Sequence, residues 1–222
     1  MAIHTVVISV NDTVSDLDPL GRRFAALGAP PELGDVWYTA TFHQYVALVA
    51  ADDPTSFGEV GLAVARRLLS RFCLEMDLDA AAALVLRCYL QLPAHPDVVP
   101  GVLAMRTAGL ELVALSTEGP HVAEGLLQRT GISAYFDHVL SVEEMLRWQP
   151  VPETYRHLAT AVDRPPHELL IASAQPWDLH GAALGGLSTA YIDRHGRRGF
   201  SYFREPDVVA TDMIGLATAL GC

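Results

Sequence analysis

The clearest structural signal in this chain lies close to its start, in the stretch His4-Thr5-Val6-Val7-Ile8-Ser9-Val10-Asn11-Asp12-Thr13-Val14. β-Branched residues run from Thr5 to Ile8 and then give way to polar residues, which is typical of a buried parallel strand ending in a loop. In open α/β sheets, ligands bind outside the carboxyl ends of the strands. We therefore expect the residues from Ser9 to Thr13 to face a ligand. The alternative is an ordinary strand exit without chemistry.

Three later stretches repeat this pattern of an apolar segment followed by polar residues. They are Leu115-Ser116-Thr117-Glu118-Gly119-Pro120, the segment from Phe136 to Val142 with Gln149 to Tyr155 after it, and the segment from Ile171 to Ala182. Helix-like and strand-like patterns alternate between about Val99 and Ile192. Such alternation predicts a doubly wound α/β core, a parallel sheet with helices on both faces.

The segment between the first strand and the second interrupts this alternation. We expect residues 15–92 to form a small helical cap inserted into a core made of residues 1–14 and 93–222. The expected cap helices run from about 21 to 28, 34 to 50, 56 to 72 and 77 to 90. The second should carry one broad apolar face with aromatic residues. Ser56, with Glu59 three residues later, is the expected N-cap of the third.

Taken together, the four stretches resemble the haloacid dehalogenase superfamily, in the branch of the type II L-2-haloacid dehalogenases. The resemblance covers nearly the whole chain and implies an α/β core with a helical cap. In the family, an aspartate nucleophile stands at the position of Ser9, a lysine at Gln149 and a substrate-binding arginine at Tyr38. The serine, asparagine and aspartate of the family's fourth motif fall on Ser173, Gln175 and Asp178, respectively.

The resemblance also gathers a set of candidate site residues. The catalytic candidates are Asp178, Ser9 and Tyr38, and the ligand-binding candidates are Asn11, Thr13, Phe42, Ser116, Thr117, Gln149, Tyr155, Ser173, Gln175 and Trp177. A carboxylate in a partly apolar pocket without a cation should have a raised pKa, which suits acid/base work near neutral pH. The alternative is that Asp178 caps the helix that begins near Trp177. His180 is expected to point away from the site.

The departures from the family fall on the positions that carry its chemistry. A serine hydroxyl is a poor nucleophile without a base to take its proton, whereas a carboxylate is already ionised at neutral pH. All 15 cationic side chains are arginine, so no lysine elsewhere can replace the one missing at Gln149. Phosphatase members bind magnesium through two aspartates, whose places here are Ser9 and Asn11. We therefore expect no metal or other cofactor, and neither dehalogenation through a covalent ester nor phosphoryl transfer.

Two classes of function remain, together with a minor third. The first is a repurposed enzyme that uses Asp178 for noncovalent cyclisation, isomerisation, dehydration or elimination of a small organic molecule. The second is a catalytically dead protein that binds a ligand or partner with the same residues. The third is residual hydrolase or dehalogenase activity, in which Asp178 activates water directly.

Composition narrows the partners. The formal net charge is -11, and the arginines are scattered without a basic tract, so nucleic acid is not an expected partner. No apolar run reaches the roughly 18 residues of a membrane span, and the start lacks a signal-peptide pattern. We expect a cytoplasmic protein, neither in nor on a membrane, whose three cysteines form no disulfide framework. Similar dehalogenases are dimers, which implies a possible homodimer through the aromatic cap helix.

Overall fold

The computed structural model describes residues 3–53, 55–144, 148–194, 196 and 201–222. The chain forms two compact units. The first consists of Met1–Ser15 and Pro93–Cys222, and the second of Asp16–Leu92. Each unit is described by itself below.

A six-stranded sheet forms the centre of the first unit in the described residues, and its strand order is β3-β2-β1-β4-β5-β6. All of its neighbouring strands are parallel. The strands are β1 (Thr5–Ser9), β2 (Glu111–Ser116), β3 (His138–Ser141), β4 (Leu169–Ser173), β5 (Ser188–Ile192) and β6 (Val208–Ala210). The opening stretch of the sequence thus supplies β1, in the middle of the sheet.

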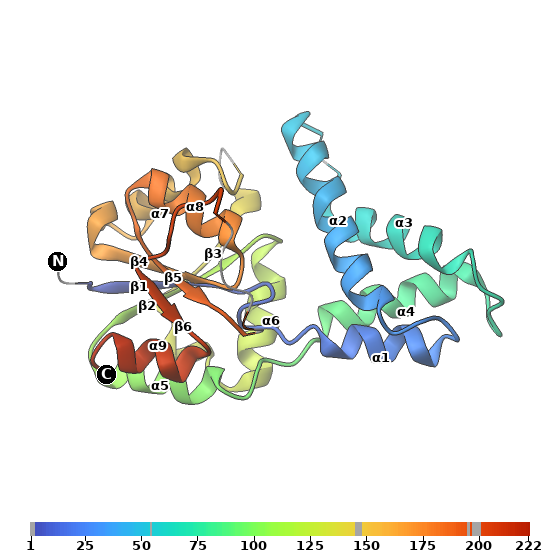
Figure 1. Ribbon diagram of the computed structural model, residues 1–222, viewed down its shortest axis with the longest axis horizontal. Coiled ribbons are helices and arrows are strands. Elements are labelled where there is room, and N and C mark those ends of the chain that lie inside the picture. The colour runs from blue at the N-terminus through green and yellow to red at the C-terminus, as the bar shows by residue number, and fades with distance from the viewer. Residues whose placement is uncertain (1–2, 54, 145–147, 195, 197–200) are drawn as a thin grey trace. The chain divides into compact units, whose positions relative to one another are not determined.

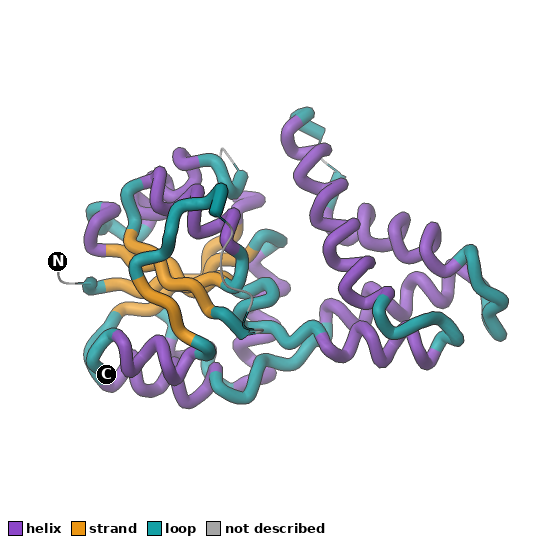
Figure 2. Tube along the Cα trace, viewed as in Figure 1, coloured by secondary structure: helices purple, strands orange, loops and turns teal. Residues whose placement is uncertain are grey.

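Helices cover both faces of this sheet (Figures 1 and 2). They are α5 (Val98–Thr107), α6 (Pro120–Thr130), α7 (Pro152–Ala161), α8 (Pro176–Gly185) and α9 (Met213–Ala219). Short 3-10 helices at Ser133–Tyr135, Val142–Glu144 and Pro166–Glu168 were not expected from the sequence. The prediction of a doubly wound α/β fold is confirmed.

Strand periodicity assigns the side chains of β1 to the two faces. Val6 and Ile8 belong to a buried cluster with apolar residues of α5, α6 and α9. Successive side chains of a strand point to opposite faces of the sheet, so Val7 and Ser9 face the side of α7 and α8. In β4 the same alternation puts Ala172 in the cluster and Ser173 on the other face. Ser9 and Ser173 therefore share one face and one end of two adjacent strands.

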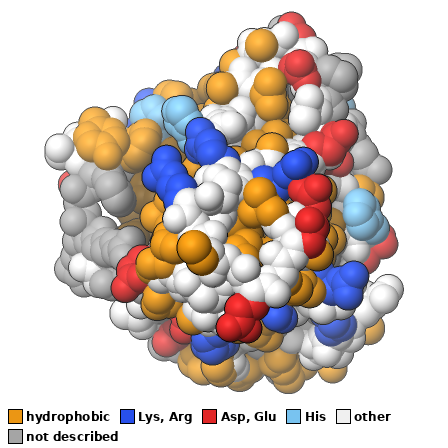
Figure 3. All heavy atoms as spheres, turned by 90° about the vertical axis from the view of Figure 1, so that its right-hand side faces the viewer, with side chains coloured by type: hydrophobic (Ala, Val, Ile, Leu, Met, Phe, Trp, Pro, Cys, Tyr) orange, Lys and Arg blue, Asp and Glu red, His pale blue; other side chains and the backbone are white. Residues whose placement is uncertain are grey.

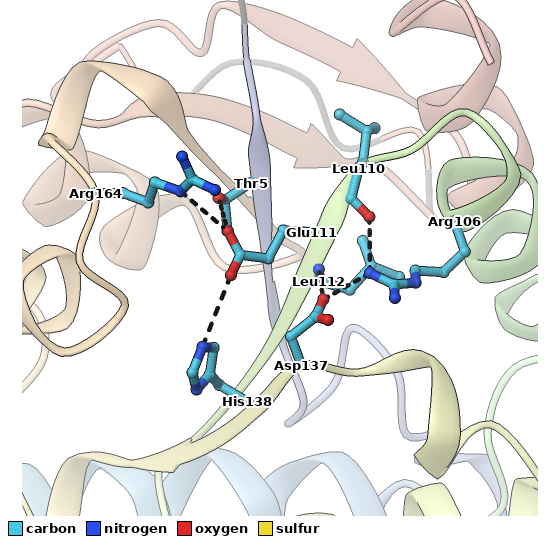
Figure 4. Close-up of polar contacts among 8 residues, drawn as sticks. All are labelled: Thr5, Arg106, Leu110, Glu111, Leu112, Asp137, His138 and Arg164. Atoms are coloured by element: carbon cyan, nitrogen blue, oxygen red, sulfur yellow. Dashed lines mark hydrogen bonds and ion pairs between the residues drawn. The ribbon is translucent and has the colours of Figure 1, made fainter.

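Charged side chains tie the strands together at the opposite, amino-terminal end of the sheet (Figure 4). The Glu111 carboxylate accepts hydrogen bonds from Thr5 Oγ1 at 2.8 Å and from Arg164 Nε at 3.2 Å, and His138 Nε2 lies 3.7 Å from it. Asp137 accepts from Arg106 Nη1 at 2.6 Å. These partly exposed contacts join β1, β2 and β3 far from the ends where ligands bind in such sheets.

The second unit consists of α1 (Asp18–Ala26), α2 (Leu33–Ala50), α3 (Phe57–Leu69) and α4 (Leu78–Leu90). Its core is aromatic. Trp37 is fully buried, its indole Nε1 donates to the carbonyl oxygen of Gly61 at 2.9 Å, and its ring meets that of Tyr89 edge-on at 5.3 Å. Tyr89 also stacks on Phe57 with 5.4 Å between the ring centroids. Burying these rings is the main source of stability for so small a unit.

One detail of this unit differs from the sequence predictions, and two agree with them. Helix α1 begins at Asp18, earlier than expected, because proline is well tolerated in a first helical turn and Pro19 lies inside the helix. The apolar face expected for α2 agrees with the structure, since Trp37, Thr41 and Tyr45 are buried and its other members are half-buried. The capping box between Ser56 and Glu59 is present as predicted.

One face of the surface carries side chains of several kinds. On the face drawn in Figure 3, arginine side chains are interspersed with aspartate and glutamate side chains, and apolar groups lie between them. Within the described part of the chain, no helix combines the length and the apolar character needed to cross a bilayer. All three cysteines are free thiols.

Two glycines allow α8 to pack closely against the segment that carries Gln149 and Tyr155. A Cβ atom on Gly181 would lie 2.1 Å from the carbonyl oxygen of Pro150, and one on Gly185 would lie 2.8 Å from the Cβ of Tyr155. Any larger residue would have to push the helix away. The close packing puts the first turn of α8 beside the side chains of Gln149 and Tyr155.

We predict that Gly181→Ala lowers the free energy of unfolding by about 2 kcal/mol or more, because the added methyl group overlaps backbone. Gly125→Ala in α6 is the matched control, since its Cβ would meet only the flexible end of Arg129. That variant should be neutral or gain up to about 1 kcal/mol of helix propensity. Urea unfolding measures both. Equal stability of the two variants would show that the contact with Pro150 does not constrain α8.

Candidate functional site

The candidate site lies at the carboxyl ends of β1 and β4, on the sheet face covered by α7 and α8. Ser9 is the last residue of β1 and Ser173 the last of β4, and both are buried. The two strands are parallel neighbours in which Ile8 pairs with Ala172, so the two serines follow adjacent positions. Helix α8 starts three residues after Ser173 and brings Asp178 to the same face.

Asp178 is the centre of this arrangement. Its side chain is buried, with 1% of the residue exposed, and its Oδ1 accepts hydrogen bonds from Gln149 Nε2 at 2.8 Å and from the Tyr155 hydroxyl. The same hydroxyl lies 2.9 Å from the carbonyl oxygen of Asp178. Because a phenol has one proton, it can donate to only one of these acceptors at a time. When it donates to the carbonyl, its oxygen is free to accept from a protonated carboxyl group.

Burial sets the protonation behaviour of this pair. Loss of solvation raises the pKa of Asp178, and hydrogen bonds from Tyr155, Ser173, Gln149 and Ser9 offset only part of that rise. Burial, followed by the charge of Asp178, raises the pKa of Tyr155 well above its ordinary value, so Tyr155 stays a phenol at neutral pH. The pKa rise expected for Asp178 from the sequence is confirmed. The capping alternative is wrong, since Gln175 is the N-cap residue and Asp178 bonds to Gln149 and Tyr155 instead.

Two buried acceptors at this centre have no hydrogen-bond partner in the described part of the chain: Asp178 Oδ2 and Gln149 Oε1. The Ser9 and Ser173 hydroxyl groups lie close enough to the carboxyl group to lower its pKa. Neither makes a hydrogen bond of regular geometry with Oδ2. A buried acceptor without a donor lowers the free energy of unfolding. Asp178 Oδ2 and Gln149 Oε1 are therefore expected to make the folded protein less stable.

A second group of predicted residues holds loops together. Asn11 Oδ1 accepts from the Thr117 backbone N–H at 3.0 Å and from its hydroxyl at 2.8 Å, which joins the loops after β1 and β2. The Ser116 hydroxyl oxygen accepts from the N–H of Glu118 at 3.2 Å. Thr13 Oγ1 accepts from the N–H of Ala174 at 2.8 Å. The structure therefore gives these residues a role in positioning the loops, and a direct ligand contact for them stays a prediction.

The Gln175 side chain joins the loop after β4 to the loop after β1. Its Nε2 donates to the carboxylate of Asp12, and its Oε1 accepts from Trp177 Nε1 at 3.0 Å. Asp12 has a positive φ of 62°, a conformation that aspartate tolerates better than most residues and that turns the loop after β1. Gln175 is also tied to the site through its backbone, because its carbonyl oxygen accepts from the N–H of Asp178 at 3.1 Å.

Tyr38 and Phe42 belong to the second unit. Both are half-buried on α2, and the ring centroid of Tyr38 lies 6.3 Å from that of Tyr89. Their assignment to the ligand pocket stays a prediction. His180 has the structural role expected from the sequence, because its Nδ1 accepts from the N–H of Arg204 at 3.1 Å and its ring lies against Phe203.

Sequence reasoning missed an ion pair that supports the loop after β1. Arg194, which follows β5, donates to both carboxylate oxygens of Asp97 at 2.9 and 3.1 Å and to the carbonyl oxygen of Thr13 at 2.7 Å. Asp97 also accepts from the N–H of Met213 at 2.8 Å. Burial alone would raise the pKa of Asp97, but the hydrogen bonds and charge of Arg194 outweigh it, so this pKa is lowered. Asp97 and Arg194 are 97 positions apart in the sequence, and no sequence pattern links them.

The donor set does not suit the magnesium ion that phosphatase members of the family bind. The two positions that would supply carboxylates hold Ser9 and Asn11, and the Asn11 side-chain oxygen already accepts two hydrogen bonds. Among the described residues, no group of three or more His, Cys, Asp or Glu side chains is arranged to hold a metal ion. We derive no step through a metal.

The fold and the polar cluster at its strand ends define an α/β protein with a helical insertion after the first strand. A family model described as haloacid dehalogenase-like hydrolase matches residues 9–186, and the chain belongs to this family. This confirms the family resemblance seen in the sequence motifs.

Several relatives are haloacid dehalogenases. The haloacetate dehalogenase H-2 of Moraxella sp. (strain B) is 25% identical over 179 residues, which cover 79% of this chain and 74% of the relative. The (S)-2-haloacid dehalogenase of Pseudomonas sp. (strain YL) is 27% identical over 194 residues, or 87% and 79% of the two chains.

Solved structures agree on the fold. The L-2-haloacid dehalogenase from Xanthobacter autotrophicus superimposes with a TM-score of 0.87 at 21% identity, covering 99% of this chain and 98% of that one. Another L-2-haloacid dehalogenase has a TM-score of 0.86 at 27% identity and is covered completely, as is this chain. The fold of the dehalogenases is thus present along the whole chain.

The raised pKa of Asp178 predicts how stability depends on pH. Above its unfolded-state pKa, near the ordinary 3.8, the folded protein keeps a proton that the unfolded chain has released, so the free energy of unfolding falls as the pH rises through the folded-state pKa. Asp178→Asn removes this titration while keeping an Oδ1 acceptor for Gln149 and Tyr155. At pH 7 it should be at least as stable as the native protein in urea unfolding.

Asp178→Ala is the contrasting variant, because it leaves Gln149 Nε2 without an acceptor and leaves the Tyr155 hydroxyl only the backbone carbonyl oxygen at that position. It should lose about 2 kcal/mol or more at pH 7. If Asp178→Asn were destabilised as much as Asp178→Ala and followed the native pH dependence, the carboxyl group would be ionised in the folded protein.

The Asp97–Arg194 pair predicts the opposite pH dependence. Since the pKa of Asp97 is lowered, its contribution to stability is complete above the ordinary value near 3.8 and disappears as the pH falls through the folded-state pKa. Asp97→Asn should cost about 2 kcal/mol at pH 7, between the values for exposed and buried pairs, and less at pH 3. Asp79→Asn, which breaks an exposed pair with Arg66, should cost under about 1 kcal/mol. Equal losses in the two variants would contradict this.

Proposed function

We propose that this protein is an enzyme that has kept the fold of the dehalogenases but acts by noncovalent acid/base catalysis on a small organic molecule. The reaction class is a cyclisation, isomerisation, dehydration or elimination. The observation that carries this proposal is the buried Asp178 carboxyl group, held on one oxygen by Gln149 and Tyr155, with its other oxygen unpartnered among the described residues. Such a group can take up and return a proton.

Asp178 would do the chemistry, and its neighbours would hold it in place. Gln149 and Tyr155 fix Oδ1, so the proton is exchanged at Oδ2. A raised pKa puts the two protonation states of Asp178 closer in free energy at neutral pH, which is the condition under which one carboxyl group serves as both base and acid. Tyr155 is a positioning residue, because its own pKa is too high for it to lose a proton.

A covalent mechanism has little support in these residues. Ser9 would need a base to take its proton, and the hydrolases that use serine place a histidine between the serine and the carboxylate. Asp178 is the ionisable group whose pKa the Ser9 hydroxyl lowers. Ser9 therefore contributes a hydroxyl group to the wall of the site. We also keep Tyr38 as a candidate catalytic residue and Phe42 as a candidate ligand contact from the cap unit.

Two other functions are favoured by specific observations. A ligand-binding or partner-binding protein without catalysis is favoured by the hydrogen bonds of Asn11, Thr117 and Gln175 to their own loops, which leave these groups engaged inside the protein. Residual hydrolysis by water attack, with Asp178 as the base, is favoured by the dehalogenase relatives. The homodimer and the cytoplasmic location remain expectations.

Turnover measurements with matched variants test the proposal. Three assays are used. They measure chloride release from 2-chloropropionate, p-nitrophenol release from p-nitrophenyl phosphate, and solvent deuterium incorporation into a panel of small hydroxy and oxo compounds. For any compound turned over, Asp178→Asn should lower kcat by about 100-fold or more, and Ser9→Ala by no more than a few-fold. The dependence of kcat on pH should follow a single carboxyl group. Asp79→Asn is the control for a lost surface charge.

The outcomes separate the three functions. Exchange or elimination without halide or phosphate release supports noncovalent catalysis. Halide release that survives Ser9→Ala and not Asp178→Asn indicates water attack. A covalent adduct on Ser9 would contradict the proposal, and saturable binding with no turnover of the whole panel would replace it with a binding role.

A further inference from the structure

We propose that the site beside Asp178 recognises its ligand through an uncharged hydrogen-bond donor, such as a carboxamide, and discriminates against a carboxylate. The geometry behind this is a pair of buried oxygens, Asp178 Oδ2 and Gln149 Oε1, which receive no hydrogen bond of regular geometry in the described part of the chain. Gln149 Oε1 can only accept, and Asp178 Oδ2 accepts when the carboxyl group is ionised. The inference rests on the proposed function only for the location of the site, and it concerns binding alone.

The orientation of the Gln149 amide is set by its contact with Asp178. Its Nε2 lies 2.8 Å from Asp178 Oδ1. Exchanging the amide nitrogen and oxygen would put an amide oxygen against a carboxyl oxygen, and two acceptors repel one another. Oε1 is therefore the outer atom of the amide, and it can only accept. Because one hydrogen bond joins the two side chains, the two acceptors belong to neighbouring groups.

The surroundings complete a site for a donor. Ser9 and Ser173 can each donate or accept, so they adapt to either kind of ligand. No described arginine hydrogen-bonds to Asp178, Gln149 or Ser9, and the chain contains no lysine. Both Nη atoms of Arg194 donate to Asp97 and to the Thr13 carbonyl oxygen, although its Nε has no partner in the described part of the chain. With Asp178 ionised, a carboxylate would thus meet acceptors of its own polarity, whereas an N–H group would satisfy them.

A matched pair of probes tests this inference. Lactamide and lactate have the same carbon skeleton and differ in a carboxamide against a carboxylate. Isothermal titration calorimetry of the full-length protein at pH 7 should show binding of lactamide at least about tenfold tighter than binding of lactate. Equal or tighter binding of lactate, or no measurable binding of lactamide, would overturn the inference.

Three variants show whether the two acceptors cause the preference. Gln149→Lys supplies a cation, so it should shift the preference toward lactate. Asp178→Asn converts the Oδ2 acceptor into an N–H donor and should abolish the preference for lactamide. Gln128→Lys makes the same charge change on an exposed position of α6 in the same unit and should leave the preference unchanged. A shift in Gln128→Lys as large as in Gln149→Lys would mean that net charge, and not the site, sets the preference, and would overturn the inference.

The failure of this inference is distinguishable from failure of the proposed function. If lactamide is preferred and Asp178→Asn leaves turnover intact, donor recognition holds and acid/base catalysis fails. If Asp178→Asn abolishes turnover and lactate binds as well as lactamide, catalysis by Asp178 holds and donor recognition fails.

Discussion

The burial of one carboxyl group without a cation is the constraint on which the rest of this site depends. Transferring an ionised carboxylate into a protein interior is very costly unless a partner charge or several donors compensate for it. Asp178 has two donors on one oxygen and no hydrogen bond of regular geometry on the other in the described part of the chain. The protein can keep such a group only because the scaffold around it is rigid and because protonation relieves the cost.

That scaffold is built from close backbone packing. Gly181 lets α8 approach the carbonyl oxygen of Pro150 more closely than any residue with a side chain would allow, and Gly185 does the same beside Tyr155. These contacts set the distance between the first turn of α8 and the donors of Gln149 and Tyr155. The polar loops at the strand ends are fixed separately, by Asn11 with Thr117 and by Arg194 with Asp97. The residues that fix the loops are therefore different from the residue proposed to exchange a proton.

Much of the fold was predictable because strands and helices in this chain have strong periodic patterns. The β-branched run of β1, the capping box of Ser56 and the alternation after residue 98 all appear in the structure. The apolar face of α2 was also predictable, although hydrophobicity alone does not say which of its residues are fully buried. Only Trp37, Thr41 and Tyr45 with Gly34 lie on its buried line.

The site was predictable in part. Residues near one strand end are identified by position in the sequence, which is why Ser9, Ser173 and Asp178 were found together. Which polar side chains bind each other is decided by loop geometry, and a sequence cannot show that Asn11 accepts from Thr117 or that Gln175 reaches Asp12. Asp97 and Arg194 meet only because β5 and the segment before α5 converge in space.

The residues at two positions of the site can be understood together through the charges that they lack. At the positions that the family resemblance assigns to a carboxylate and a lysine, the chain has Ser9 and Gln149, which removes one negative and one positive charge. Losing the lysine alone would have left two buried carboxylates side by side, which is far costlier than a neutral serine and glutamine beside the single carboxylate of Asp178. Asp178 therefore keeps its carboxyl group without a cation. With Gln149 beside it, this group is hydrogen-bonded but has no opposite charge to neutralise it, so protonation is the means of neutralisation. Under the function proposed above, such a carboxyl group moves protons and forms no covalent bond with the ligand.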